Sequence, residues 1–227
     1  MGVNNSIPIL NTRFVKGNEN IIVQKIISSI NFKLSTKKIC VICISGGTSP
    51  LIVLKHLFKK ELDWNRIYFF LTDERIVKNN SIHSNFKKIT NCINNKKINL
   101  FQLYNYNLSV KKNIINYQNH IDNFIFKKNK AAIDLLILGF GKDGHIASIF
   151  PDQDSLVCSK SLILNNQNIN SFKRISMNMK ILKSSDRTFI LSYGRKKFDL
   201  ISKGLNDNLP IFKFINGQKN VEWFYQI

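Results

Sequence analysis

The sequence predicts an α/β protein with a largely parallel sheet flanked by helices. Apolar runs bounded by turn residues alternate with amphipathic stretches along the chain, as in repeated β/α units. The clearest run, Ile133–Leu138, is almost entirely apolar, which is typical of a strand buried on both faces. The length of 227 residues fits one large domain or two small ones, and no internal repeat or low-complexity linker divides it.

The expected elements follow in chain order. We expect a helix near Asn18–Phe32, a strand at Lys38–Ile44 and a helix at Pro50–Lys60. Ser49 is the expected N-cap of that second helix and Pro50 its first residue. Further strands are expected, with helices between them, at Arg66–Leu71, Ile98–Leu103, Ile133–Leu138, Arg174–Asn178 and Arg187–Tyr193. The pattern leaves the order of the strands in the sheet open.

The net charge of +20 ordinarily indicates a nucleic-acid or anionic-surface partner. Here the lysines are scattered among many Asn and Ile residues, with no long basic tail and no alternation of basic and aromatic residues. Such a composition is also what an AT-biased genome produces. We therefore expect no nucleic-acid partner, and the charge favours small acidic substrates, sugar phosphates included.

Membrane, disulfide and metal classes are not favoured. No apolar run approaches the ~20 residues that cross a bilayer, and Met1–Leu10 lacks the features of a signal peptide, so a cytoplasmic location is expected. Cys40 and Cys43 fall in a predicted buried strand, and no second Cys/His pair has metal-ligand spacing. We expect neither a disulfide framework nor a metal ion.

The segment after Leu138 is the strongest candidate for catalysis. Gly139, Gly141 and Gly144 keep the backbone accessible, and among them stand Asp143 and His145, at the edge of the sheet where α/β proteins bind ligands. An imidazole is well suited to moving protons near neutral pH. A dinucleotide-binding Gly-x-Gly-x-x-Gly motif is one alternative, although Ser161–Asn166 lacks the acid expected about 20 residues later. A histidine that only completes a loop is the other.

A second candidate lies between the first expected strand and its helix. Small and hydroxyl residues there bring free backbone N–H groups to a helix N-terminus, where anions bind. No Gly-Lys-Ser/Thr sequence follows, so a single phosphate is favoured over a nucleoside triphosphate. A tight turn that needs small residues is the alternative. The residues concerned are Ser45, Gly46, Gly47, Thr48 and Ser49.

Charged residues follow the next strand as well. Arg75 has the planar fork that holds a negative charge, and Asp73 is placed to handle a proton or to form hydrogen bonds. A structural ion pair between these two residues is the competing interpretation. Arg174 and Lys197, taken singly, are most simply interpreted as solvated charges.

Four blocks in order resemble the 6-phosphogluconolactonases over nearly the whole chain. They are Ser-Gly-Gly-Thr-Ser-Pro at 45–50, Trp64-x-Arg66-x-x-Phe69-Phe70-x-x-Asp73-Glu74-Arg75-x-Val77, Ser84-Asn85, and Gly139-x-Gly141-x-Asp143-Gly144-His145-x-Ala147-Ser148-x-Phe150-Pro151. These lactonases share a superfamily with the hexosamine-6-phosphate deaminases. The resemblance implies one domain over 1–227 with a modified doubly wound, Rossmann-like fold.

The resemblance also implies the activity and the roles of the site residues. The reaction is hydrolysis of 6-phospho-D-glucono-1,5-lactone to 6-phosphogluconate, in the oxidative pentose phosphate pathway, without a cofactor or metal. By similarity His145 is the general base, Asp143 orients it, and Arg75 offsets the oxyanion charge. Asp73 remains a further candidate catalytic residue. The loop Ser45–Ser49, with Arg174 and Lys197, holds the 6-phosphate of a protein expected to be a monomer or homodimer.

Departures from the family pattern keep alternatives open. Ile146 replaces the usual Thr, as it does in the deaminases, which favours glucosamine-6-phosphate deaminase as the second interpretation. Against it, Ile149-Phe150-Pro151 lacks the deaminase Glu, and Arg75 stands where the deaminases have Tyr. Lys78, Asn79, Asn80 and His83 also differ from the family at the rim of the pocket. A non-catalytic sugar-phosphate sensor is a third interpretation, but it would not need Asp143, His145 and Arg75 together.

Overall fold

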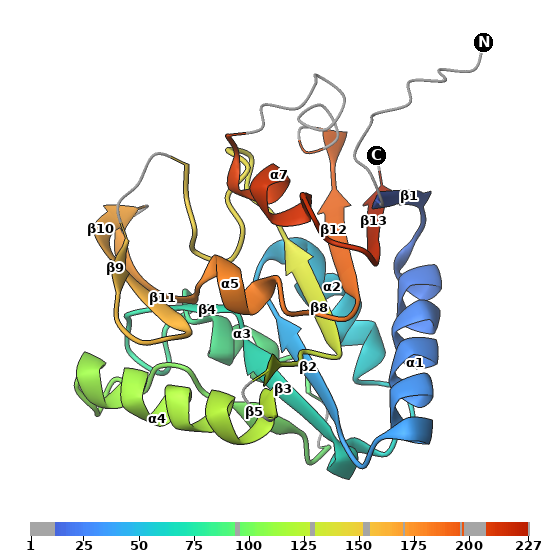
Figure 1. The fold of residues 1–227 in the computed structure, drawn as a ribbon, viewed down its shortest axis with the longest axis horizontal. Coiled ribbons are helices and arrows are strands. Elements are labelled where there is room, and N and C mark those ends of the chain that lie inside the picture. The colour runs from blue at the N-terminus through green and yellow to red at the C-terminus, as the bar shows by residue number, and fades with distance from the viewer. Residues whose placement is uncertain are drawn as a thin grey trace.

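The computed structural model describes residues 12–93, 96–127, 130–151, 155–169, 171–195, 197 and 208–226. Met1–Leu10, where no signal peptide is expected, lies outside the described residues. The centre of the fold is a seven-stranded sheet in which every neighbouring pair is parallel (Figure 1). Its spatial order is β1 (Thr12–Lys16), β13 (Val221–Gln226), β12 (Thr188–Tyr193), β8 (Leu135–Gly139), β2 (Cys40–Ile44), β3 (Ile67–Leu71) and β5 (Asn99–Phe101). This confirms the predicted α/β class.

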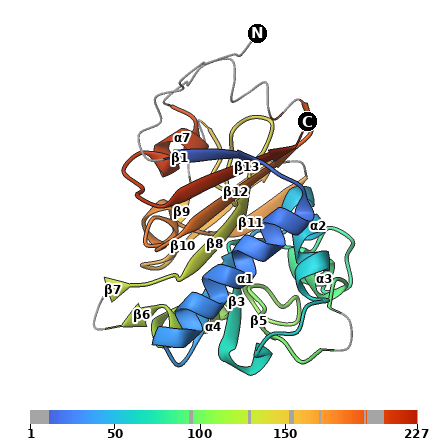
Figure 2. The same ribbon diagram turned by 90° about the vertical axis from the view of Figure 1, so that its right-hand side faces the viewer.

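Helices cover both faces of the sheet. In Figures 1 and 2, α1 (Glu19–Thr36) runs along one face and α4 (Val110–Phe124) lies on the other side. Neighbouring residues of β3 show the two faces: the Phe69 ring packs 5.5 Å from that of Phe58, just after α2 (Thr48–Leu57), and the Phe70 ring 5.9 Å from that of Tyr117 on α4. Successive strand residues point to opposite faces, so both must be apolar.

The central strand β2 is buried at all five positions. Cys40 and Cys43 lie in it, as predicted, and burial raises the pKa of both thiols, that of Cys40 to about 12. Such thiols are protonated and unreactive at neutral pH. They serve as small apolar core residues.

The start of α2 was predicted two residues too late. The helix begins at Thr48 with Gly47 as its N-cap, so Ser49 and Pro50 lie inside its first turn. Proline is tolerated there because the first backbone N–H groups of a helix have no intrahelical partner. The difference matters for the site, because the backbone N–H groups of Thr48 and Ser49 belong to the first turn of the helix.

A second sheet lies beside the first and corrects another expectation. It is antiparallel, with the order β4 (Asp73–Arg75), β11 (Phe172–Met177), β10 (Leu162–Ile169) and β9 (Leu156–Val157). The strand expected at Arg174–Asn178 therefore belongs to this sheet and not to the parallel one. Strands β9 and β10 stand in the part of the chain, between Leu138 and Arg174, where a helix was expected.

Short elements complete the described fold. They are the 3₁₀ turn Trp64–Arg66, α3 (Asn85–Thr90), α5 (Met179–Leu182), α7 (Pro210–Ile215) and the small hairpin of β6 (Phe126–Lys127) and β7 (Lys130–Ala131). No helix in the described part of the chain is long and apolar enough to span a membrane.

The strand order locates the ligand-binding edge. From β2 the chain adds β3 and β5 on one side, and it then returns to add β8, β12 and β13 on the other. The order reverses between β2 and β8, and in open α/β sheets ligands bind beyond the carboxyl ends of the strands at such a point.

Candidate active site

The carboxyl ends of β12, β8, β2 and β3 surround a cavity of about 230 Å³. Eight residues predicted from the sequence line it: Ser45, Gly47, Thr48, Asp73, Arg75, His145, Arg174 and Lys197. The other three lie just behind: Asp143 contacts His145, Ser49 contacts Lys197, and Gly46 lines an adjoining cavity. The structure therefore brings the predicted residues to one place.

His145 is held by Asp143 and Phe150. Its Nδ1 lies 2.6 Å from Oδ1 of Asp143, and its ring lies 4.4 Å from the Phe150 ring, centroid to centroid. A carboxylate only accepts hydrogen bonds, so Nδ1 carries the hydrogen and Nε2 of the neutral ring can accept a proton. The hydrogen bond from His145 lowers the pKa of Asp143. The carboxylate thus stays ionised and fixes the tautomer that a general base needs.

The loop that carries His145 is a tight turn closed by the backbone. Gly141 N–H donates to the carbonyl of His145 at 2.8 Å, and Gly144 adopts a φ of +79°, which favours glycine. Ala147 has a φ of +48°, which is rare without glycine and costs conformational energy. Residues 140–151 form no helix. The dinucleotide-binding alternative, which requires a helix at this point, is not supported.

The Ser45–Ser49 segment, where β2 runs into α2, forms another part of the cavity wall. The hydroxyl oxygen of Ser45 accepts a hydrogen bond from Gly139 N–H at 2.9 Å, which fixes the ends of β2 and β8 together. Gly47 caps α2 without a side-chain hydrogen bond. The first-turn N–H groups and the helix dipole thus remain available to an anion.

Lys197 closes this wall. Its Nζ donates to Oγ of Ser49 at 3.3 Å and lies 5.5 Å from the centroid of the Phe140 ring. Burial, and secondarily the charge of Lys142, lowers the pKa of Lys197. A cation held in partly desolvated surroundings attracts an anion more strongly than a solvated one.

Arg75 and Arg174 stand directly opposite each other on β4 and β11. Opposed cross-strand residues lie on the same face of a sheet, and like charges there destabilise the pair. Arg174 is buried, and burial together with the charge of Arg75 lowers its pKa. Its guanidinium also lies 5.4 Å from the Phe150 ring. An anion between the two arginines would offset their repulsion.

The two acids between the sheets have separate roles. Asp73 is buried and accepts a hydrogen bond from Ser148 Oγ at 2.7 Å, and it forms no ion pair with Arg75. The structural ion pair considered for these two residues is therefore absent. Glu74 points the other way and accepts from the backbone N–H groups of Asn85 and Phe86, both at 2.7 Å, at the start of α3. Burial raises the pKa of Glu74.

Several cavity residues were not predicted as site residues: Asn85, Phe140, Lys142 and Ala147. Asn85 is buried, and its Nδ2 donates to the backbone carbonyl of Asp73 at 3.0 Å. It is also close to Gly46, where any Cβ would lie 2.4 Å from the Asn85 side chain. Asn85 belongs to the Ser84-Asn85 block of the family resemblance, and that block was the feature of the sequence that could have identified it as a cavity residue.

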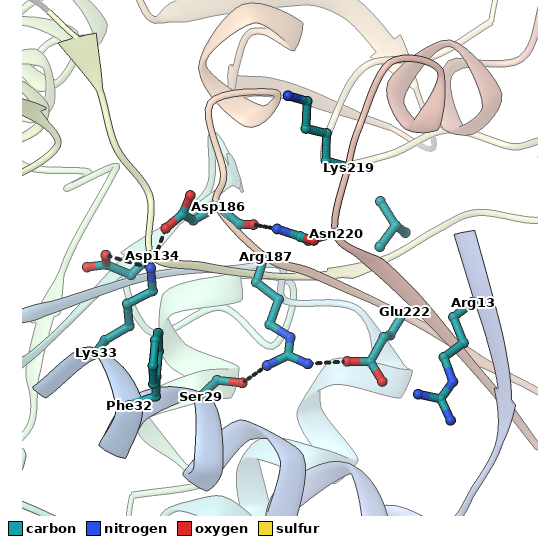
Figure 3. A pocket seen from close by; sticks show the side chains of 11 residues that line it. Arg13, Ser29, Phe32, Lys33, Asp134, Asp186, Arg187, Lys219, Asn220 and Glu222 are labelled. Carbon is teal, nitrogen blue, oxygen red and sulfur yellow. Dashed lines mark hydrogen bonds and ion pairs between the residues drawn. The ribbon is translucent and has the colours of Figure 1, made fainter. Parts of the chain in front are cut away.

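Another cavity, of about 540 Å³, lies at the opposite edge of the sheet, by the amino ends of β8, β12 and β13 (Figure 3). Its acids are neutralised by neighbouring cations: Arg187 donates to Glu222 at 2.7 Å, and Lys33 pairs with Asp186. Arg187 also donates to Ser29. These contacts connect α1 to the sheet, and no histidine lines the cavity. Its carboxylates are held in ion pairs, so despite its size it is less suited to proton transfer than the cavity that contains His145.

Comparisons with known proteins show the family of the chain. Residues 19–223 match the family described as glucosamine-6-phosphate isomerases/6-phosphogluconolactonase. The 6-phosphogluconolactonase of Thermotoga maritima is 30% identical over 216 residues, 92% of this chain and 94% of that protein. Its crystal structure superposes with a TM-score of 0.80, covering 94% of this chain and 98% of that one at 26% identity. A 6-phosphogluconolactonase structure from Shewanella baltica, 20% identical over 97% of this chain and 99% of that one, has a TM-score of 0.81 and supports the fold. The chain belongs to the family of glucosamine-6-phosphate isomerases and 6-phosphogluconolactonases.

Proposed function

We propose that this chain hydrolyses 6-phospho-D-glucono-1,5-lactone to 6-phospho-D-gluconate, the lactonase step of the oxidative pentose phosphate pathway. The observation that carries the proposal is the His145–Asp143 pair, 2.6 Å apart, at a cavity that Arg75, Arg174 and Lys197 also line. The pair supplies a base for water, and the cations suit a phosphorylated substrate. The lactonase relatives support the same reaction.

The proposed mechanism begins with a water molecule between His145 and the lactone carbonyl. Nε2 of His145 removes a proton as the water oxygen bonds to C1, and the carbonyl electrons move to the oxygen. Arg75 lies on the cavity wall and stabilises that oxyanion. The C1–O bond to the ring oxygen then breaks, and the imidazolium returns its proton to the departing oxygen. Asp143 stays ionised and stabilises the imidazolium.

The 6-phosphate is proposed to lie against the first turn of α2, between Lys197 and Arg174. Lys197 is already fixed to that turn through Ser49, so little side-chain entropy is lost on binding. Remote binding energy of this kind positions the ester for attack. Asp73, held by Ser148, would accept a hydrogen bond from a sugar hydroxyl.

Phe150 argues against the deaminase alternative. The deaminases place a Glu for ring opening in this part of the loop, where this chain has Phe150, stacked on His145. An aromatic ring cannot transfer the proton that ring opening requires. Ile146, the residue that favoured a deaminase, is fully buried and lies outside the cavity lining.

Location and partners belong to the proposal as well. We place the protein in the cytoplasm, in agreement with its four free cysteines, since disulfides are rare there. It would act as a monomer or homodimer without a nucleic-acid partner, cofactor or metal. Sedimentation would give the oligomeric state. Absence of DNA or RNA binding at about 0.15 M salt would support the expectation that the protein has no nucleic-acid partner.

The decisive experiment is a coupled assay on the purified protein. The lactone is generated in situ, and 6-phosphogluconate formation is compared with the uncatalysed rate, with glucosamine 6-phosphate deamination measured in parallel. Lactone hydrolysis should fall to the uncatalysed rate in His145→Asn and persist in His56→Asn, whose histidine lies near the far end of α2. Deamination alone would favour the alternative reaction, and activity on neither substrate would favour a sensor.

A further inference from the structure

A third cavity, of about 350 Å³, adjoins the active-site cavity and shares Gly47, Thr48 and Arg75 with it. Two lysines, Lys55 and Lys88, join Arg75 in its lining, and no carboxylate does. We call it the Lys88 cavity. Its volume is at the lower end of the range for small-molecule sites.

Lys88 is in an unfavourable place for a cation. It is partly buried, and its Nζ has no carboxylate within ion-pair distance among the described residues. Burial, and secondarily the charge of Arg75, lowers its pKa, and the charges of Glu74 and Asp73, which form no ion pair with it, offset only part of this shift. Two other partly buried lysines are paired with carboxylates: Lys25 lies 2.6 Å from Glu222 and Lys96 lies 2.7 Å from Glu61. A desolvated, unpaired cation beside another cation indicates that an anion is missing.

The remaining walls complete an anion site. Nε of Arg75 is buried and has no hydrogen-bond partner in the described part of the chain, while Nη1 donates to the His83 carbonyl at 2.8 Å and so holds the side chain in place. Leu51 and Ile52 form an apolar side that limits water. The first residue of α2, Thr48, adds the positive end of a ten-residue helix.

We propose that the Lys88 cavity is a second anion site, for a phosphate-class dianion, either free phosphate or the phosphate of a small phosphomonoester. Three cations and no carboxylate favour a dianion over a monoanion. Because Arg75 and the start of α2 serve both cavities, an anion bound here would weaken binding of the phosphorylated substrate. That coupling rests on the proposed lactonase function, whereas binding itself does not.

Cys92 offers a direct readout, because it lines the Lys88 cavity and no residue of the active-site cavity carries a thiol. Alkylation by neutral iodoacetamide is followed by peptide mass spectrometry, with inorganic phosphate or with sodium chloride at the same ionic strength. Phosphate should slow modification of Cys92 several-fold and leave Cys158, in a separate part of the fold, unchanged. Glycerol 3-phosphate, tested likewise, distinguishes a phosphomonoester site from a free-phosphate site.

Matched variants localise the effect. Lys88→Met should abolish phosphate protection of Cys92, whereas Lys87→Met, which alters an exposed neighbour on α3, should retain it. Lys197→Met should also retain protection, since Lys197 belongs to the other cavity. Melting curves in phosphate give a second measure, and Lys88→Met should lose part of the increase in melting temperature.

Equal protection in Lys88→Met, or a phosphate-induced increase in melting temperature that Lys88→Met leaves unchanged, would show that the cavity does not bind the anion. In the lactonase assay, Lys88→Met should keep the basal rate and become less sensitive to phosphate. An inactive wild-type protein with protected Cys92 would contradict the lactonase function and leave the anion site established.

Discussion

Gly141→Ala tests the contact on which the proposed catalysis depends. A Cβ at this position would lie 2.1 Å from Nδ1 of His145 and 2.4 Å from Oδ1 of Asp143, whereas ordinary contacts begin at 3.4 Å. The backbone φ of Gly141 is not in the left-handed region, so alanine itself is not strained there. The substitution therefore acts on the side-chain pair, which must move.

The expected size of the effect follows from these distances. The imidazole must retreat by about 1.3 Å to restore a 3.4 Å contact. Displacing a catalytic group by ~1 Å costs roughly 100-fold in rate, which corresponds to about 2.7 kcal/mol of activation free energy. Both side chains are partly exposed and can turn toward solvent, so the free energy of unfolding should change by less than about 1 kcal/mol.

Steady-state lactone hydrolysis and urea unfolding check both numbers. The turnover number should fall about 100-fold in Gly141→Ala, while KM, set mainly by the phosphate contacts, should change little. Gly17→Ala is the matched control, because its nearest contact would be an ordinary 3.5 Å. A Gly141→Ala protein within about threefold of the wild-type turnover would refute the role given to the His145–Asp143 geometry.

Three other perturbations have defined outcomes. The pKa of Lys197 is lowered, so affinity for 6-phosphogluconate, measured by calorimetry, should decrease with rising pH below pH 10.5 as the amine becomes neutral, and Lys197→Met should remove that pH dependence. Arg75→Lys should lower the turnover number roughly 100-fold through loss of the planar fork; an unchanged turnover would exclude oxyanion stabilisation by Arg75. Glu222→Gln should reduce the free energy of unfolding by about 1–3 kcal/mol in urea titrations without altering turnover, because Glu222 pairs with Lys25 and Arg187. The pKa of Glu222 is lowered by these cations, so its stabilisation is present above the ordinary value of 4.5 and is lost as pH falls through the folded-state value.

Much of the site could be predicted because the carboxyl ends of parallel strands lie at the same edge of the sheet. The apolar runs of β2, β3 and β8 are visible in the sequence, and the polar residues that follow each run must lie near the same edge. That reasoning needs no knowledge of which strands are neighbours. It located Ser45, Arg75 and His145 correctly.

The strands that the sequence analysis missed are stabilised by partners far away in the sequence. Strand β13 contains Glu222, an acid that argues against a buried strand until Lys25, 197 residues away, and Arg187 neutralise it. Strand β4 has only three residues, too few for a recognisable pattern, and it is a strand only because β11 pairs with it. Pairing over about 100 residues cannot be inferred from local sequence preferences.

The antiparallel sheet explains why Arg174 seemed unremarkable in the sequence. Alone, an arginine in a polar stretch is best interpreted as a solvated charge, but pairing with β4 places it opposite Arg75 and buries it. Cross-strand pairs contribute roughly 0.2–1 kcal/mol, and for like charges that contribution is unfavourable. The fold therefore places two cations where they repel each other, and negative charge brought between them would offset that repulsion. Because the unfavourable energy is already present in the free protein, we expect an anionic substrate to relieve it on binding, and under the proposed function the second sheet would then help to place the substrate as well as stabilise the domain.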